Sequence, residues 1–126
     1  MPESYRIKVS NYSDAILARM QARQAARIYG FTLKNQASIS LAMWSLASTM
    51  GLGQTCKGEI IIEQVSEANR SGMRVTCSIP DVNLPEPIPG VFNQTRWMVD
   101  ELIIKPLPEK GFEVTTIKWL EENGGN

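Results

Sequence analysis

The chain has 126 residues, of which 43% are hydrophobic and 21% are charged, a balance typical of one globular domain, which excludes wholesale disorder. Thirteen basic residues balance thirteen acidic ones, so the net positive charge that drives non-specific binding to nucleic acid is missing. Histidine is absent, which excludes His-ligated metal sites and the catalytic pairing of histidine with serine or cysteine.

The N-terminal part of the chain predicts a strand followed by a helix. Apolar and polar side chains alternate over residues 5–10, which is the pattern of a half-buried strand. Strong helix formers then run from a capping residue, Ser13 or Asp14, to a stop at Gly30. The side chains of this helix that are expected to pack on the sheet are Ile16, Met20 and Ile28.

A second helix is predicted from a cap at Thr32 to a glycine stop at Gly51 or Gly53. Trp44 stands one step away from its apolar face, so it either flanks the core or is exposed, and packing in the core is the preferred interpretation. The apolar face itself follows a spacing of four, three and four positions through Ile39, Met43, Leu46 and Met50.

The middle of the chain predicts an antiparallel hairpin and a rigid loop. Residues 59–65 and 73–77 are rich in β-formers, and the polar residues 66–72 between them are expected to form a surface loop. Four of the seven prolines fall within residues 80–89, which excludes a helix and favours extended backbone.

The C-terminal part predicts a short helix and a last strand. The helix is expected to begin at Asn93 or Thr95 and to extend through Leu102. It would contain the adjacent acids Asp100 and Glu101, which are expected to be solvated or to face a partner. The strand is indicated by alternation after residue 111, with Ile117 and Trp119 on its other face.

The expected order is therefore strand, helix, helix, strand, strand, helix, strand. This order indicates an α/β two-layer sandwich, in which helices cover one face of a sheet, as a single domain over residues 1–120 with a frayed polar tail at 121–126. No apolar run is long enough to span a membrane and the N-terminus resembles no signal peptide, so a cytoplasmic protein with no membrane role is expected.

The two cysteines indicate the same compartment. Cys56 and Cys77 stand 21 positions apart with no metal-binding spacing, which favours buried thiols in a reducing environment. A redox disulfide stays an open alternative, because it requires the two Cα atoms to lie within about 7 Å of each other.

Three strings carry a resemblance to a known family: residues 25–31, residues 58–65, which end in Glu-Gln-Val, and residues 117–120, Ile-Lys-Trp-Leu. They are similar to the histidine-kinase-like (GHKL, or Bergerat-type) ATPases, and more narrowly to the bacterial anti-sigma or switch serine kinases, typified by the T component of the sigma B stressosome regulators. The resemblance covers nearly the whole chain except residues 79–94. It implies a mixed, mostly antiparallel sheet covered on one face by helices.

The resemblance also implies where the nucleotide motifs would stand, and this chain departs from them. The family's catalytic glutamate and magnesium-binding asparagine correspond to Ser45 and Thr49, whose hydroxyls are weaker bases and ligands. The glycine-rich ATP lid is missing and a shorter proline-rich segment, residues 85–90, takes its place. The family's adenine-reading aspartate and the two glycines after it correspond to Ile79, Asp81 and Asn83.

These departures predict a non-catalytic chain without cofactor or metal, a pseudoenzyme that regulates a stress or sigma-factor pathway by binding a protein. The alternative is an active ATP-dependent serine kinase with divergent motifs, and nucleotide binding separates the two. Whether the former nucleotide pocket is empty, plugged or reused for another ligand stays open.

A basic stripe on the first helix is the candidate partner surface. Arg19, Arg23 and Arg27 recur every four residues, so they form either a solvated face or a contact for an acidic partner. In the family the first helix binds partners, so the resemblance implies Arg19 and Arg23 as partner-binding residues, with Arg27 peripheral. The implied partners are a STAS-domain antagonist, a sigma factor or a PP2C-type phosphatase. A homodimer through the open sheet face is a further expectation, and binding of nucleic acid is not expected.

Overall fold

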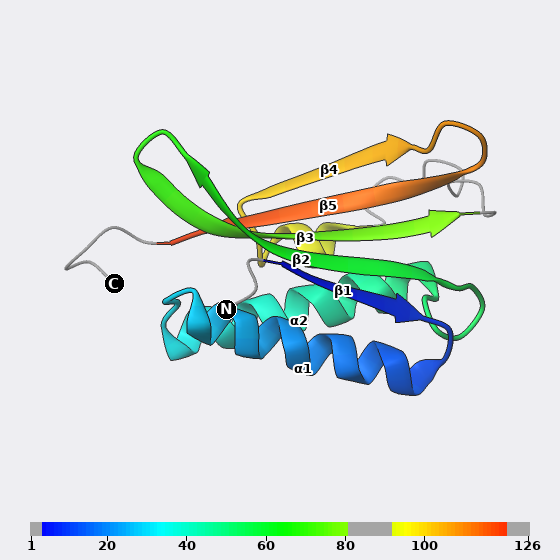
Figure 1. The fold of residues 1–126 in the computed structure, drawn as a ribbon, viewed down its shortest axis with the longest axis horizontal. Helices are drawn as coiled ribbons and strands as arrows, with labels where there is room; N and C mark the ends of the chain where they lie inside the picture. Colours follow the sequence, from blue (N-terminus) through cyan, green and yellow to red (C-terminus); the bar gives the residue numbers. More distant parts are fainter. Residues whose placement is uncertain (1–3, 81–91, 121–126) are drawn as a thin grey trace.

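The computed structural model describes residues 4–80 and 92–120. Figure 1 shows two layers, with α1 and α2 side by side across one face of the sheet, so the predicted α/β class is confirmed. In chain order the elements are β1 (Ser4–Val9), α1 (Tyr12–Ile28), α2 (Leu33–Met50), β2 (Gly58–Glu67), β3 (Arg70–Pro80), α3 (Asn93–Arg96), β4 (Glu101–Pro106) and β5 (Gly111–Trp119).

The five described strands form one open sheet in the order β1-β2-β3-β5-β4. Each of its four pairings is antiparallel, so the expectation of a mixed sheet is wrong for this part of the chain. In the register, Cys77 of β3 stands between Ile60 of β2 and Val114 of β5, and all three side chains are buried beneath the helices. The alternate residues of these strands point to the open face.

The β2–β3 hairpin is longer than predicted. The ladder continues to the pair Glu67 and Arg70, so only Ala68 and Asn69 form the turn, in place of a loop over residues 66–72. Backbone hydrogen bonds extend the strands through polar residues because a ladder does not require apolar side chains. Ala68 adopts a positive φ of 53°, a conformation that side chains with a Cβ rarely take.

A strand that the sequence did not indicate lies at the sheet edge. The predicted helix through Leu102 ends at Arg96, and Leu102 belongs to β4. Two acids tie the start of this strand to β5: Asp100 accepts a hydrogen bond from the Trp119 backbone N–H at 2.7 Å, and Glu101 accepts one from the Trp119 indole at 2.8 Å. Asp100 is exposed and Glu101 half-buried, so the expectation of solvated acids holds, but both acids also make contacts that stabilise the sheet edge.

Local capping explains where the two long helices begin and end. The Asn11 side chain, ahead of the predicted cap, accepts a hydrogen bond from the Asp14 backbone N–H, and Gly30 follows α1 with a φ of 100°. Thr32 caps α2 and the left-handed Gly51 ends it, as predicted. Gly30 and Gly51 both have a positive φ, which glycine adopts more readily than other residues.

Alanines, rather than the predicted larger residues, form the buried face of α1. Ile16 and Met20 are 40% and 63% exposed, so the expectation that they pack on the sheet is wrong, whereas Ile28 is partly buried against the core. Small side chains let a helix backbone approach its neighbours closely. The buried face of α1 therefore consists of Ala15, Ala18, Ala22, Ala25 and Ala26. The predicted apolar face of α2 does join the core.

Candidate functional site

A cavity of about 290 Å³ opens between α2 and α3. Ser45 and Thr49 both contribute to it, since positions four apart on a helix share a face. The structure therefore brings together the two residues at which the resemblance implies loss of the catalytic glutamate and the magnesium ligand. The described residues that line the cavity are Leu41, Trp44, Ser45, Ser48, Thr49, Gln94 and Met98.

A hydrogen bond between two hydroxyls fixes one wall of this cavity to the other. Ser45 Oγ lies 2.9 Å from Thr95 Oγ1, and the Thr95 side chain is completely buried. The short helix α3 is thereby tied to the middle of α2. Ser48 and Thr49, which are exposed, also line the cavity.

The remaining positions implied by the resemblance are not part of this cavity. Ile79 is fully buried in β3 opposite Phe112 of β5, and it is absent from the residues that line the cavity. Asp81, Asn83 and the proline-rich residues 85–90 lie outside the described residues. Sequence reasoning missed Gln94 and Met98, for which neither spacing nor motif gave a signal.

The chemistry of the cavity is neutral. Its described residues offer hydroxyl, amide and apolar groups but no carboxylate. Across residues 4–80 and 92–120, no group of three or more Asp, Glu, His or Cys side chains is placed to hold a metal ion. Because Mg²⁺ is held in proteins through carboxylates together with substrate phosphates, these side chains do not fit a protein-bound magnesium ion.

On the outer side of the helices, Arg19 is anchored rather than free. Its Nε donates to Ser40 Oγ at 3.2 Å, and its guanidinium lies 5.4 Å from the centre of the Trp44 ring. Tyr12 meets the same ring edge-on at 5.6 Å. Arg19 is therefore half-buried, which corrects the expectation that it is presented outward, whereas Arg23 is exposed. Trp44 flanks the core, half-buried, instead of entering it.

Exposed apolar side chains accompany the arginines on α1. Tyr12, Ile16 and Met20 recur every four residues and are 48%, 40% and 63% exposed. The same spacing that indicates the arginines also indicates this stripe, whereas the sequence analysis expects two of its members, Ile16 and Met20, on the buried face. The outer face of α1 is thus mixed in character, with apolar and cationic side chains side by side.

Both cysteines are free thiols. Cys77 lies in the core, where burial raises its pKa to about 12. Cys56 is half-buried ahead of β2, where its Sγ donates to the Met50 carbonyl oxygen at 3.2 Å and burial raises its pKa. Neither microenvironment favours the reactive thiolate form.

Comparison with known proteins gives one informative relative. The sequence matches no protein-family model. It is 28% identical, over an alignment of 131 positions, to the serine/threonine-protein kinase RsbT of Bacillus subtilis (strain 168). The alignment covers 90% of this chain and 95% of the relative, so the two proteins correspond over nearly their whole lengths.

This similarity overturns one prediction. The chain was expected not to be an enzyme, but a relative that aligns with it nearly end to end carries the name of a kinase. The finding points to kinase activity in place of a pseudoenzyme. Among the described residues, no helix is long and apolar enough to cross a membrane.

Proposed function

We propose that the protein is an ATP-dependent serine/threonine protein kinase similar to RsbT, with a GHKL-type fold, which acts on a protein partner in a partner-switching stress or sigma-factor pathway. The observation that carries the proposal is the similarity to RsbT across 90% of the chain. A two-layer domain with a cavity against its second helix supports it, because such a cavity offers room for a substrate.

The cavity between α2 and α3 is the proposed nucleotide site. Trp44 and Met98 supply apolar surface for a base, whereas Ser48, Thr49 and Gln94 supply polar groups for ribose and phosphate oxygens. Its volume of about 290 Å³ is near the lower end of the range of small-molecule sites, about 300–1,000 Å³.

The proposed catalysis rests on positioning. Phosphoryl transfer requires little covalent chemistry from the protein, because the reaction is accelerated mainly by alignment of the reacting groups and by stabilisation of charge. Thr49 and Ser48 would orient the phosphates by donating hydrogen bonds, while Thr95 holds the hydroxyl of Ser45 against the cavity wall. We assign no protein ligand to a metal ion, since the described side chains do not fit one.

The proposed partner surface is the outer face of α1. Arg23 is exposed and can engage a carboxylate, and Arg19 is already held by Ser40 and Trp44, which lowers the entropy lost on binding. A STAS-domain antagonist is the partner class proposed as the phosphate acceptor. We do not extend the proposal to a homodimer, because the open sheet face carries the ion pairs of Arg6 with Glu59 and of Arg74 with Glu63.

The test measures transfer of the labelled γ-phosphate of ATP, in the presence of magnesium, to a STAS-domain protein from the same genome. Ser48→Trp should fill the cavity and reduce transfer at least about tenfold, a change of about 1.4 kcal/mol. Leu33→Trp, on the exposed side of the same helix and away from the cavity, is the matched control and should transfer normally. No transfer by the parent protein, or normal transfer by Ser48→Trp, would contradict the proposal.

A second measurement addresses the partner surface. Arg23→Ala should weaken capture of the STAS-domain protein at least about tenfold, or about 1.4 kcal/mol, because an arginine at the centre of an interface is often a hot spot. Arg27→Ala removes the same charge one turn away and should have a smaller effect. Equal effects of the two substitutions would show that only bulk charge matters there.

A further inference from the structure

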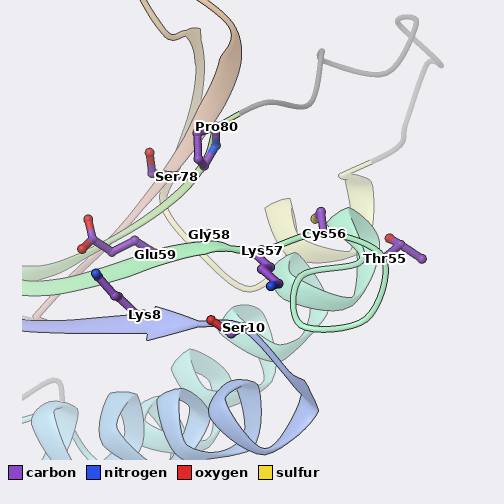
Figure 2. Close-up of a pocket in the computed structure, with 9 residues that line it drawn as sticks. All are labelled: Lys8, Ser10, Thr55, Cys56, Lys57, Gly58, Glu59, Ser78 and Pro80. Atoms are coloured by element: carbon purple, nitrogen blue, oxygen red, sulfur yellow. The ribbon is translucent and has the colours of Figure 1, made fainter.

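A second and larger cavity, of about 600 Å³, lies at the edge of the sheet where β1 and β3 end and β2 begins, and it shares no residue with the cavity between α2 and α3. Figure 2 shows that its side chains come from the end of β1, from the start of β2 with the loop before it, and from the end of β3. We infer that this cavity binds a small phosphate-bearing molecule. The residues that line it are Lys8, Ser10, Thr55, Cys56, Lys57, Gly58, Glu59, Ser78 and Pro80.

The charges in the cavity favour an anion. Lys8 and Lys57 both line it, and among residues 4–80 and 92–120 neither has a carboxylate within ion-pair distance. The carboxylate of Glu59 is engaged by a residue outside the cavity, since its Oε1 lies 2.6 Å from Nη1 of Arg6. Glu59 also lines the cavity, opposite Lys8 in the β1–β2 register, but the two lysines outnumber this one carboxylate and leave the cavity net positive for a ligand.

The polar groups match phosphate in particular. The hydroxyls of Ser10 and Ser78 line the cavity with the lysines and can each donate a hydrogen bond, whereas the Thr55 hydroxyl already donates to the Gly51 carbonyl oxygen at 3.4 Å. A phosphate group carries a charge near −2 and several strong acceptor oxygens, so it uses both lysines and hydroxyls. The volume exceeds what one phosphate fills and lies within the range of small-molecule sites, which leaves room for an organic portion.

One wall of the cavity is fixed before any ligand arrives. The backbone N–H groups of Gln54, Thr55 and Cys56 all donate to the Gly51 carbonyl oxygen, at 3.0, 2.9 and 3.2 Å. Gly53 closes the same loop by donating to the Cys56 carbonyl oxygen at 2.8 Å. A loop held in this way positions the residues it carries at low entropic cost to binding.

Cys56 provides a readout inside the cavity, because it is half-buried there while Cys77 is completely buried. The rate at which the folded protein reacts with N-ethylmaleimide, an uncharged reagent, therefore reports on the cavity. Pyrophosphate and glucose 6-phosphate are the probes, and sodium chloride at equal ionic strength is the control for screening. At about 10 mM, a probe that binds with a Kd of about 1 mM should slow the reaction about tenfold.

Paired variants separate recognition from bulk charge. Replacing Lys8 and Lys57 by glutamine should abolish the protection, whereas Lys34→Gln, an exposed lysine at the start of α2, should preserve it. Protection by pyrophosphate points to an inorganic source, and protection by glucose 6-phosphate alone points to an organic phosphate; both support the inference. Failure of both probes, equal slowing by sodium chloride, or protection that survives the double substitution would overturn it. None of these outcomes depends on kinase activity, so the proposed function is tested separately.

Discussion

The hydroxyl pair between α2 and α3 predicts an asymmetric response to mutation. Ser45→Ala leaves the completely buried Thr95 hydroxyl without its partner, 2.9 Å away, and out of reach of water. The expected loss of unfolding free energy is about 1–3 kcal/mol, the cost of an unsatisfied buried group. Thr95→Val keeps the side-chain volume and leaves the Ser45 hydroxyl without its partner. Because Ser45 lines the cavity, water can hydrate this hydroxyl. The expected loss of unfolding free energy is therefore smaller, about 0.5–1 kcal/mol.

Urea unfolding of the two single variants and the double variant measures the effect. The double variant should be more stable than the sum of the single losses implies, because it leaves neither hydroxyl behind, and a coupling of at least about 0.5 kcal/mol is expected. In thermal unfolding, 1 kcal/mol corresponds to a shift in Tm of about 4 °C for a chain of this length.

Thr115→Val is the matched control. Thr115 Oγ1 lies 3.4 Å from Thr76 Oγ1 on the open face, where both residues are half-buried and water is near. Its removal should change stability by less than about 0.5 kcal/mol. If Thr95→Val destabilises as much as Ser45→Ala, or if the two losses simply add, the hydrogen bond does not join the helices as described.

Three further outcomes follow from single positions. Arg19→Ala should lower the unfolding free energy by about 0.5–1 kcal/mol, through loss of its contact with Trp44, while Arg23→Ala leaves it unchanged; equal urea midpoints would contradict this. Ala68→Gly should raise the unfolding free energy by about 0.5–1 kcal/mol, because glycine adopts the positive φ of this position without strain. A lower urea midpoint for this variant would contradict the positive φ in the β2–β3 turn. Burial raises the pKa of Cys77 from 9.0 to about 12, so its contribution to stability is complete below pH 9 and is lost as pH rises toward 12. Relative to Cys77→Ala, the parent should lose up to about 1.4 kcal/mol per pH unit above pH 9, and parallel pH profiles would refute this.

The features that could be predicted from the sequence are those whose causes are local. The cap at Thr32 and the glycine ends at Gly30 and Gly51 involve neighbours within a few positions, and each is where it was expected. The edge strand β4 was missed because its first residues are held by Trp119, which follows Asp100 by 19 positions. Glu101–Pro106 shows no alternation, because its apolar residues 102–104 are consecutive, and the apolar residues upstream favoured a helix.

In the candidate site, too, the features with local causes could be predicted and those that depend on distant contacts could not. Helical spacing places Ser45 and Thr49 on one face, and the structure brings them into one cavity. The opposite wall, with Gln94, depends on how a four-residue helix docks, which no local pattern encodes. The anchoring of Arg19 is likewise an interhelical contact, so its spacing along α1 alone indicated a more exposed residue than the structure shows.

The alanine face of α1 has a consequence for how the molecule opens. Burying a methyl-sized group contributes about 0.8 kcal/mol, so five alanines secure a 17-residue helix with much less apolar surface than leucines or phenylalanines would. We expect amide hydrogens of α1 to exchange with solvent through a partial opening that leaves the sheet and α2 protected. A protein that binds the outer face of α1 would suppress this opening. Binding would therefore slow amide exchange throughout α1, including at residues that do not contact the partner.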